Sequence, residues 1–208
     1  MEEGNPTQGF FLKTLPLSTV YSASTDSVKK AAQFSGLQGK SISLKELGGS
    51  MSVRRFWGNY FEDKHAILFV VNAAASETEM TASKAVLKEV LQDPQLPDKP
   101  VLILGTRADI PGARTSAQLE SFFADVFSMT ASSKATSMTS IKQSKKQHGS
   151  KELLQPLAVH RRWAVRCCCS FNVHQVKGSI ETLVDLILET QSQEVGRVNK
   201  KKERLVHV

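Results

Sequence analysis

No stretch of this sequence approaches the run of about eighteen apolar residues that a membrane-spanning helix needs. The acidic start, residues 1–5, lacks the basic and apolar parts of a secretory signal peptide. Its three cysteines, Cys167, Cys168 and Cys169, are consecutive, so they cannot cross-link distant parts of the chain. These absences predict a cytoplasmic protein in a reducing compartment.

The length and charge of the chain limit its architecture and its partners. A chain of 208 residues with 40% hydrophobic content can bury one ordinary core. The net charge is +7, but the basic residues are concentrated in a polar middle segment and at the C-terminus, which fits acidic lipid or protein surfaces as well as nucleic acid. Because the sequence does not interleave Lys and Arg with stacking aromatic residues, we expect no nucleic-acid partner.

The hydrophobic pattern alternates between strand-like and helix-like segments. Residues 66–71 form a continuous apolar run, typical of a parallel strand buried on both faces, and residues 101–104 repeat it. Between them, residues 77–91 show helical spacing, so the three segments predict a βαβ unit. Further strands are expected at 10–17, 41–47 and 163–169, and further helices at 116–127 and 179–188. This alternation predicts a layered α/β domain.

Three regions lie outside that pattern. Residues 18–40 have no sustained period and are expected to form a loop. Residues 128–151 are rich in Ser, Thr, Lys and Gln and poor in apolar anchors, which predicts a mobile insertion. Residues 192–208 form a basic C-terminal tail, either a solvated segment or a contact with a partner or an acidic membrane surface.

Several short motifs occur in an order that identifies a family. The string Glu46-Leu47-Gly48-Gly49 is followed by Arg55, Trp57, Tyr60 and Phe61, and residues 6–10 read Pro-Thr-Gln-Gly-Phe. Together they resemble the two switch regions of the Arf-like branch of the small GTPases. The resemblance implies the P-loop-NTPase-like small GTPase fold, which has a mixed, mainly parallel sheet with flanking helices. The corresponding domain would span residues 6–191, with insertions at 18–40 and 128–151.

The resemblance also shows which part of that fold this chain does not contain. Members of the family have a strand, a Gly-x4-Gly-Lys-Ser/Thr phosphate-binding loop and a helix before the first switch, whereas here only six residues precede Thr7. Gly39-Lys40-Ser41 looks like the end of such a loop, but Phe34 stands where its first glycine should be, and a strand-like segment follows. In the family topology the missing strand would lie between the strands at 41–47 and 66–71, leaving both with unpaired edges. We therefore expect either the insertion to fill this gap or the chain to be a truncated form.

The resemblance assigns the phosphate and metal side of the site to the switch-like segments. Thr7 would bind Mg²⁺ through its hydroxyl, although an ordinary Pro-Thr turn is the alternative interpretation. Glu46 replaces the usual Asp near the metal, and Gly48 and Gly49 would let the backbone approach the γ-phosphate. Ser50 stands at the position of the usual catalytic Gln and is too short to orient water, so we expect slow hydrolysis or none.

Two further motifs resemble the segments that recognise guanine. Thr106, Arg107 and Asp109 occupy the positions of the family's Asn-Lys-x-Asp, in which only the Asp is retained. Cys169 and Ser170 lie in a segment similar to the family's Thr-Cys-Ala-Thr loop. The cysteine triplet could also be a lipidation or metal site, but consecutive side chains in a strand alternate in direction, which favours buried structural or loop cysteines.

Two functional hypotheses follow from these motifs. The first is an Arf-like GTP-binding switch for membrane-traffic or ciliary effectors, with GTP, GDP and Mg²⁺ binding weakened in this chain. The second is a nucleotide-free pseudo-GTPase that acts as a protein-interaction module, with Trp57 and Tyr60 exposed to a partner. In both hypotheses, protein effectors contact the segments 6–10 and 46–61. Peripheral contact with a membrane through the basic tail would modify the expected cytoplasmic location.

Overall fold

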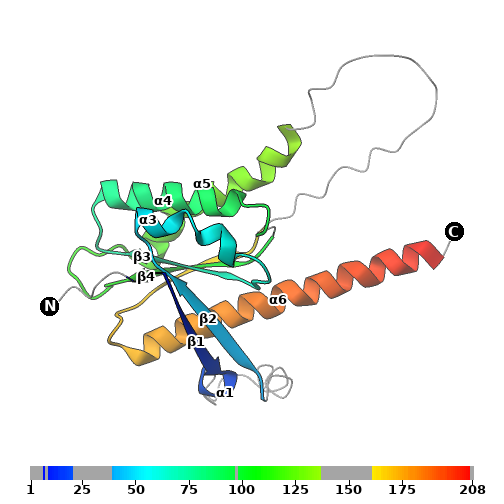
Figure 1. The fold of residues 1–208 in the computed structure, drawn as a ribbon, viewed down its shortest axis with the longest axis horizontal. Helices are drawn as coiled ribbons and strands as arrows, with labels where there is room; N and C mark the ends of the chain where they lie inside the picture. Colours follow the sequence, from blue (N-terminus) through cyan, green and yellow to red (C-terminus); the bar gives the residue numbers. More distant parts are fainter. Residues whose placement is uncertain (1–6, 8, 21–38, 97, 137–160, 207–208) are drawn as a thin grey trace.

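Two separate β-sheets organise the part of the chain that the computed structural model describes, which comprises residues 7, 9–20, 39–96, 98–136 and 161–206 (Figure 1). One is an antiparallel hairpin of β1 (Phe10–Pro16) and β2 (Ser41–Leu47). The other contains the parallel strands β3 (Ile67–Asn72), β4 (Val101–Thr106) and β5 (Trp163–Cys167) in the order β3-β4-β5. The predicted α/β class and parallel sheet are confirmed.

The larger core lies on the face of the parallel sheet that α4 (Glu77–Gln92) and α5 (Ser116–Thr136) cover (Figure 1). Leu87 of α4, Ile103 of β4 and Phe123 of α5 are fully buried in it. Each such side chain stabilises the fold by about 1.5–3 kcal/mol through its removal from water. The βαβ unit predicted from the apolar periodicity is confirmed, because β3 and β4 pair in parallel on either side of α4 in the chain.

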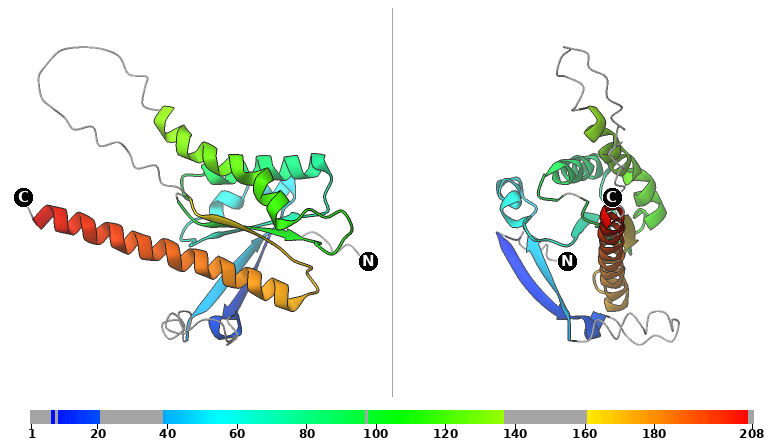
Figure 2. Two further views of the ribbon diagram at one scale, coloured as in Figure 1. Left: turned by 180° about the vertical axis from the view of Figure 1, so that it is seen from behind. Right: turned by 90° about the vertical axis from the view of Figure 1, so that its right-hand side faces the viewer.

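A second, smaller cluster lies on the opposite face, where α6 (Val173–Val206) packs (Figure 2). Ile180 and Val184 of α6 are buried against Leu17 and Val20 of the short helix α1 (Leu17–Val20). Leu15, Ile42 and Leu44 of the hairpin and Leu68 of β3 pack against the same cluster. The hairpin is therefore anchored through side chains on α6, without strand pairing to the parallel sheet.

The edge of β3 that faces away from β4 has no strand partner among the described residues. The N–H of Ile67 donates to Pro100 O and that of Ala73 to Thr106 O, so the intervening residues Leu68 and Val70 direct their N–H groups to this open edge. Val70 is 56% exposed. The prediction that residues 66–71 are buried on both faces was thus wrong, because no described element covers Val70.

The C-terminal helices are longer than their apolar patterns predicted. Helix α5 continues to Thr136, so residues 128–136, predicted to begin the mobile insertion, are helical, while 137–151 lie outside the described residues. Helix α6 runs from Val173 to Val206, over 34 residues or about 50 Å, and its C-terminal part extends beyond the sheet (Figure 2). The predicted tail is therefore helical as far as Val206. Extending an anchored helix costs little, because the unfavourable nucleation step has already occurred.

Other boundaries differ by a few residues. Residues 18–20, expected in a loop, belong to α1, while the following 21–38 lie outside the described residues. Strand β1 ends at Pro16, and β5 ends at Cys167. In the described part of the chain, no helix combines the length and apolar character needed to cross a bilayer.

Arg161, just before β5, joins this strand to the end of α4. Its guanidinium donates to the carbonyl oxygens of Leu96 at 2.8 Å, Leu91 at 3.3 Å and Lys99 at 3.4 Å. We expect Arg161→Met to lower the free energy of unfolding by about 2 kcal/mol, because these carbonyls lose a charged donor. Urea denaturation measures this, and Arg162→Met is the matched control. Its ion pair with the exposed Glu189 should contribute less than about 1 kcal/mol, so equal losses would contradict the prediction.

Candidate switch and base-recognition site

The two residues predicted to hold a metal ion lie together. Thr7 precedes β1 and Glu46 is near the end of β2, and the Thr7 hydroxyl donates to a Glu46 carboxylate oxygen at 2.6 Å. The antiparallel register explains this proximity, because Phe10 is opposite Leu47 at the same end of the hairpin. The predicted site therefore brings a hydroxyl and a carboxylate, both hard oxygen donors, into contact.

Gly48 lies directly against the backbone of Thr7. A Cβ atom at this position would be 2.0 Å from Thr7 O, so no larger residue fits without displacing the chain. The Gly48 N–H donates to Gly9 O at 3.0 Å, and the Trp57 indole donates to Gly48 O at 2.9 Å. The two switch-like segments are thus joined by their own hydrogen bonds.

After Gly49, which is exposed, the chain forms two short helical segments, α3 (Met51–Arg54) and η1 (Trp57–Tyr60). Ser50 precedes α3, and its hydroxyl lies 3.0 Å from that of Ser52. The expectation that Trp57 and Tyr60 are exposed was wrong, because both are half-buried. The indole bond to Gly48 and the contact of Tyr60 with Phe10, whose ring centroids are 5.4 Å apart, account for this burial.

The two segments predicted to recognise guanine meet at the C-terminal edge of the parallel sheet. Gly105 of β4 is opposite Cys167 of β5, and the Cys168 N–H donates to Gly105 O at 2.8 Å. Beyond the strands, the Ala108 N–H donates to Cys168 O at 3.3 Å. Ligands of open α/β sheets bind at this kind of edge.

The side chains of this edge are arranged only in part as the resemblance implies. Thr106, in place of the family's Asn, turns its hydroxyl inward and donates to Val71 O at 3.1 Å. Arg107 is exposed and has a φ of 57°, an uncommon backbone conformation for a residue with a side chain. Asp109 and Ser170 are exposed, whereas the Cys169 N–H donates to the side chain of Gln175 at 2.9 Å.

Asp109 does not cap a helix. It lies in a turn in which the Ile110 N–H donates to Arg107 O, and α5 begins only at Ser116. The start of α5 is capped by Thr115 and Gln118, since the backbone N–H of each donates to the side chain of the other. The Asp109 carboxylate is therefore accessible to a ligand at this edge.

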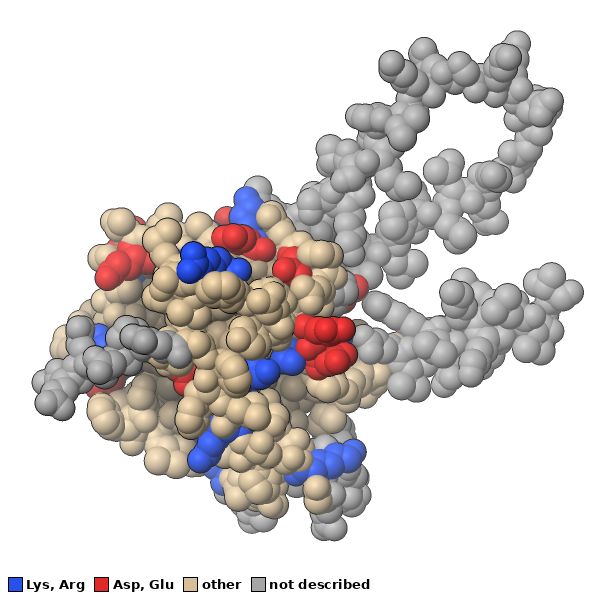
Figure 3. All heavy atoms as spheres, viewed as in Figure 1, with Lys and Arg blue, Asp and Glu red and all other residues tan. Residues whose placement is uncertain are grey.

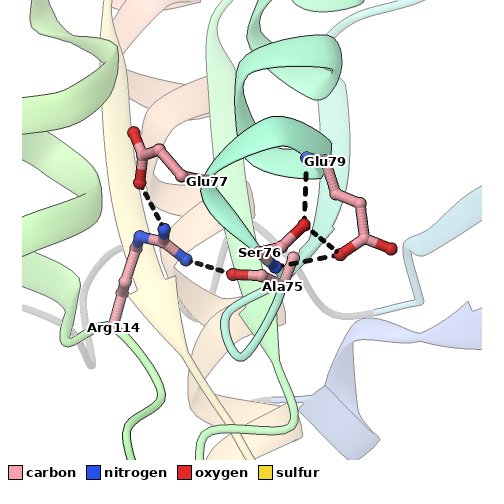
Figure 4. Close-up of polar contacts among 5 residues, drawn as sticks. All are labelled: Ala75, Ser76, Glu77, Glu79 and Arg114. Carbon is pink, nitrogen blue, oxygen red and sulfur yellow. Dashed lines mark hydrogen bonds and ion pairs between the residues drawn. The ribbon is translucent and has the colours of Figure 1, made fainter.

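Arg114 connects the loops of this edge, although the sequence offered no signal for it. Figure 4 shows its guanidinium between the Ala75 carbonyl and the Glu77 carboxylate, each 2.6 Å away. The same view shows the capping box of Ser76 and Glu79 that begins α4. Because Arg114 O also accepts from the Cys167 thiol at 3.7 Å, the loops after β3 and β4 and the end of β5 are held together.

The cysteine triplet agrees with the structural interpretation. Cys168 is 1% exposed, and burial raises the pKa of its thiol. Cys167 and Cys169 are half-buried on either side of it. Cys168 is therefore a poor nucleophile that packs beneath the base-recognition edge.

The residues present fit a guanine nucleotide and Mg²⁺ only in part. Asp109 can accept hydrogen bonds from a base, and Thr7 and Glu46 can offer oxygen atoms to a metal ion. The chain contains no Gly-x4-Gly-Lys-Ser/Thr string to surround the phosphates, and the Gly48 N–H is already bonded to Gly9. A residue that can contact the base and a pair of residues that can bind a metal ion are thus present. These residues do not provide the groups that would surround the phosphates.

Comparison of the sequence with known proteins gives matches to one protein family. The sequence model of the ADP-ribosylation factor family matches residues 3–187. Human ADP-ribosylation factor-like protein 15 is 28% identical over 187 residues, covering 88% of this chain and 78% of that protein. The ADP-ribosylation factor-like protein 1 of Saccharomyces cerevisiae is 33% identical over 78 residues, or 38% of this chain and 42% of that protein.

The fold is also found among solved structures. The small GTPase Arl6 BBS3 of Trypanosoma brucei, solved with the bound nucleotide analogue GppNp, superposes with a TM-score of 0.59. The superposition covers 91% of this chain and 86% of that chain at 14% sequence identity. At this identity, the likeness extends to the fold alone.

Proposed function

This chain belongs to the ADP-ribosylation factor family of small GTPases, and we propose that it is an Arf-like molecular switch whose nucleotide binding and hydrolysis are weakened. Its effectors would be proteins of membrane traffic or ciliary signalling that contact the segments 6–10 and 46–61. The exposed Asp109 beside the Cys168–Ser170 loop supports the descent from a guanine-binding site. The absent phosphate-binding string and Ser50 at the glutamine position support the weakening.

One observation favours a second candidate, a nucleotide-free interaction module. Two hydrogen bonds of the chain itself join the switch-like segments, Thr7 to Glu46 and Gly48 to Gly9, and a third, Trp57 to Gly48, lies within the second segment. In a conventional switch, the γ-phosphate and Mg²⁺ order these segments. Here the chain's own bonds could hold the partner-binding surface in one arrangement at all times.

The proposed interaction surface can be tested by disturbing it at Gly48. We expect Gly48→Ala to expel the Thr7 segment, because the new Cβ would lie 2.0 Å from Thr7 O. Amide exchange at residue 48 should then accelerate, and peptides selected from a random display library against the wild-type chain should no longer bind. The selection is run with EDTA and without nucleotide, so that a surface dependent on nucleotide would select nothing.

Gly49→Ala is the matched control. No atom lies within 4 Å of a Cβ at residue 49, so this variant should keep both the protection and the peptide binding. Peptides that appear only when a GTP analogue and Mg²⁺ are added would favour the nucleotide-dependent switch over the nucleotide-free module. Peptides bound equally by the wild-type chain and Gly48→Ala would contradict the assignment of the interaction surface to these segments.

The composition of the C-terminal end of α6 supports a proposal about location. Residues 197–208 contain one acidic residue, Glu203, and five Lys or Arg residues: Arg197, Lys200, Lys201, Lys202 and Arg204. Each basic residue near an anionic leaflet contributes about 1 kcal/mol of attraction. We propose that the protein is cytoplasmic and that this end of α6 meets an acidic membrane surface.

A further inference from the structure

A lysine lies between two aromatic side chains on the outer face of the hairpin. The Lys45 ammonium is 5.0 Å from the ring centroid of Phe10 and 5.1 Å from that of Tyr60. Leu12 is directly opposite Lys45 in the strand register and is 53% exposed. This Lys45 cluster, made of Phe10, Lys45 and Tyr60, joins the two switch-like segments on one surface.

The bonds of the switch-like segments hold the cluster in place. Gly9 O, which accepts from Gly48, immediately precedes Phe10, and the Trp57 indole fixes the segment that carries Tyr60. Strand alternation directs Lys45 away from Ile42 and Leu44, which pack toward α6. Neighbouring structure therefore places Lys45 on the face of the hairpin away from α6, beside the rings of Phe10 and Tyr60.

The positive charge of this surface is not neutralised within the described residues. None of the ion pairs found there includes Lys45, and the neighbouring Glu46 carboxylate accepts from Thr7. Arg54 and Arg55 likewise stack over aromatic rings, those of Trp57 and Phe56. On the face drawn in Figure 3, acidic and basic side chains alternate over the middle and top of the molecule, and only basic ones are visible at the loop end of the hairpin, which is the end away from the Lys45 cluster.

We propose that the Lys45 cluster binds an acidic segment of a protein partner, with a carboxylate on the Lys45 ammonium and a neighbouring apolar side chain on Phe10 and Leu12. Lys45 is half-buried as a residue, and an ammonium at the protein surface attracts a carboxylate more strongly than one in bulk water does. The ammonium already covers the ring faces of Phe10 and Tyr60 on its side, which leaves less room for stacked nucleic-acid bases. The proposal rests on the proposed function, in which the switch-like segments contact proteins.

The test uses the full chain and a random peptide display library in nucleotide-free buffer. We expect the selected peptides to be enriched in Asp and Glu relative to the starting library. Fluorescence anisotropy should then show that Lys45→Met weakens their binding about fivefold, whereas Lys45→Arg retains it. Lys13→Met is the matched control, because Lys13 lies on the same hairpin but on its other face, so it should bind like the wild type. Thermal unfolding of each variant confirms that it remains folded.

The outcomes separate this inference from the proposed function. Peptides without acidic enrichment that still lose binding in Tyr60→Ala would overturn the inference and leave the interaction surface standing. Peptides unaffected by Tyr60→Ala would overturn both. Binding of a single-stranded oligonucleotide or of phosphatidylserine vesicles that is lost in Lys45→Met, without any selected acidic peptide, would assign the cluster to a different class of partner and overturn the inference.

Discussion

The 208-residue chain should bind GTP or GDP more weakly than about 1 mM in the presence of Mg²⁺, equivalent to less than about 4 kcal/mol of binding free energy. Backbone N–H groups and the lysine of a phosphate-binding loop normally hold the β- and γ-phosphates, and the sequence contains no such string. The remaining contacts, Asp109 on one sheet edge and Thr7 with Glu46 on the hairpin, do not surround a phosphate. Isothermal titration measures the affinity, and micromolar binding would contradict this prediction.

Supplying a phosphate-binding loop, with the strand and helix that flank it, should restore the affinity for nucleotide. A fusion would carry the first strand, phosphate-binding loop and first helix of a nucleotide-binding family member ahead of Pro6. Among the described residues, β2 pairs only with β1, and Leu68 and Val70 of β3 direct their N–H groups away from β4, so both edges can pair with the added strand. A fusion with the loop lysine changed to alanine is the control. If the intact fusion folds and still fails to bind, the loop is not what limits binding.

In the fusion, Asp109→Ala should weaken the binding of GTP and GDP about a hundredfold and leave the weaker binding of ATP unchanged. Guanine offers the paired N1–H and N2–H donors that a carboxylate accepts, and two hydrogen bonds to a charged group contribute about 3 kcal/mol together. Adenine lacks this pair of donors. Competition between GTP and ATP measures the selectivity. The prediction is based on the exposed position of Asp109, whose neighbour Ala108 is hydrogen-bonded to Cys168.

Ser50→Gln in the same fusion is the control for affinity. Ser50 precedes α3 and belongs to a different segment from the loops after β4 and β5, so the change should leave nucleotide affinity intact. A glutamine there could orient water, so its effect belongs to hydrolysis. Equal affinity of the fusion for ATP and GTP, unaltered by Asp109→Ala, would show that this edge does not recognise guanine.

The sequence predicted the features that depend on local pattern. The apolar runs at β3 and β4 and the helical spacing of α4 specified a βαβ unit, because side-chain periodicity is set by neighbouring residues. The order of the motifs identified the family and predicted which segments lie together in each part of the candidate site. The strand 41–47 was predicted with the bounds that the structure has.

The limits of helices were less predictable. Helix α6 continues through Glu, Gln, Arg and Lys residues that have no apolar stripe comparable to that of residues 179–188. These residues are good helix formers, and they extend a helix that Ile180 and Val184 anchor to the hairpin and α1. A hydrophobic pattern that detects buried faces therefore underestimates the length of a helix that extends beyond the core.

By itself, the sequence determined the family, the α/β class and the residue types available to a nucleotide and to a metal ion. Only the tertiary structure decided that Thr7 donates to Glu46, that Arg114 joins the loops after β3 and β4, and that Lys45 lies between Phe10 and Tyr60. These contacts join residues 15 to 39 positions apart in the chain. Periodicity reports which face of an element is apolar, whereas such contacts depend on strand register and on how separate elements pack, which no local pattern encodes.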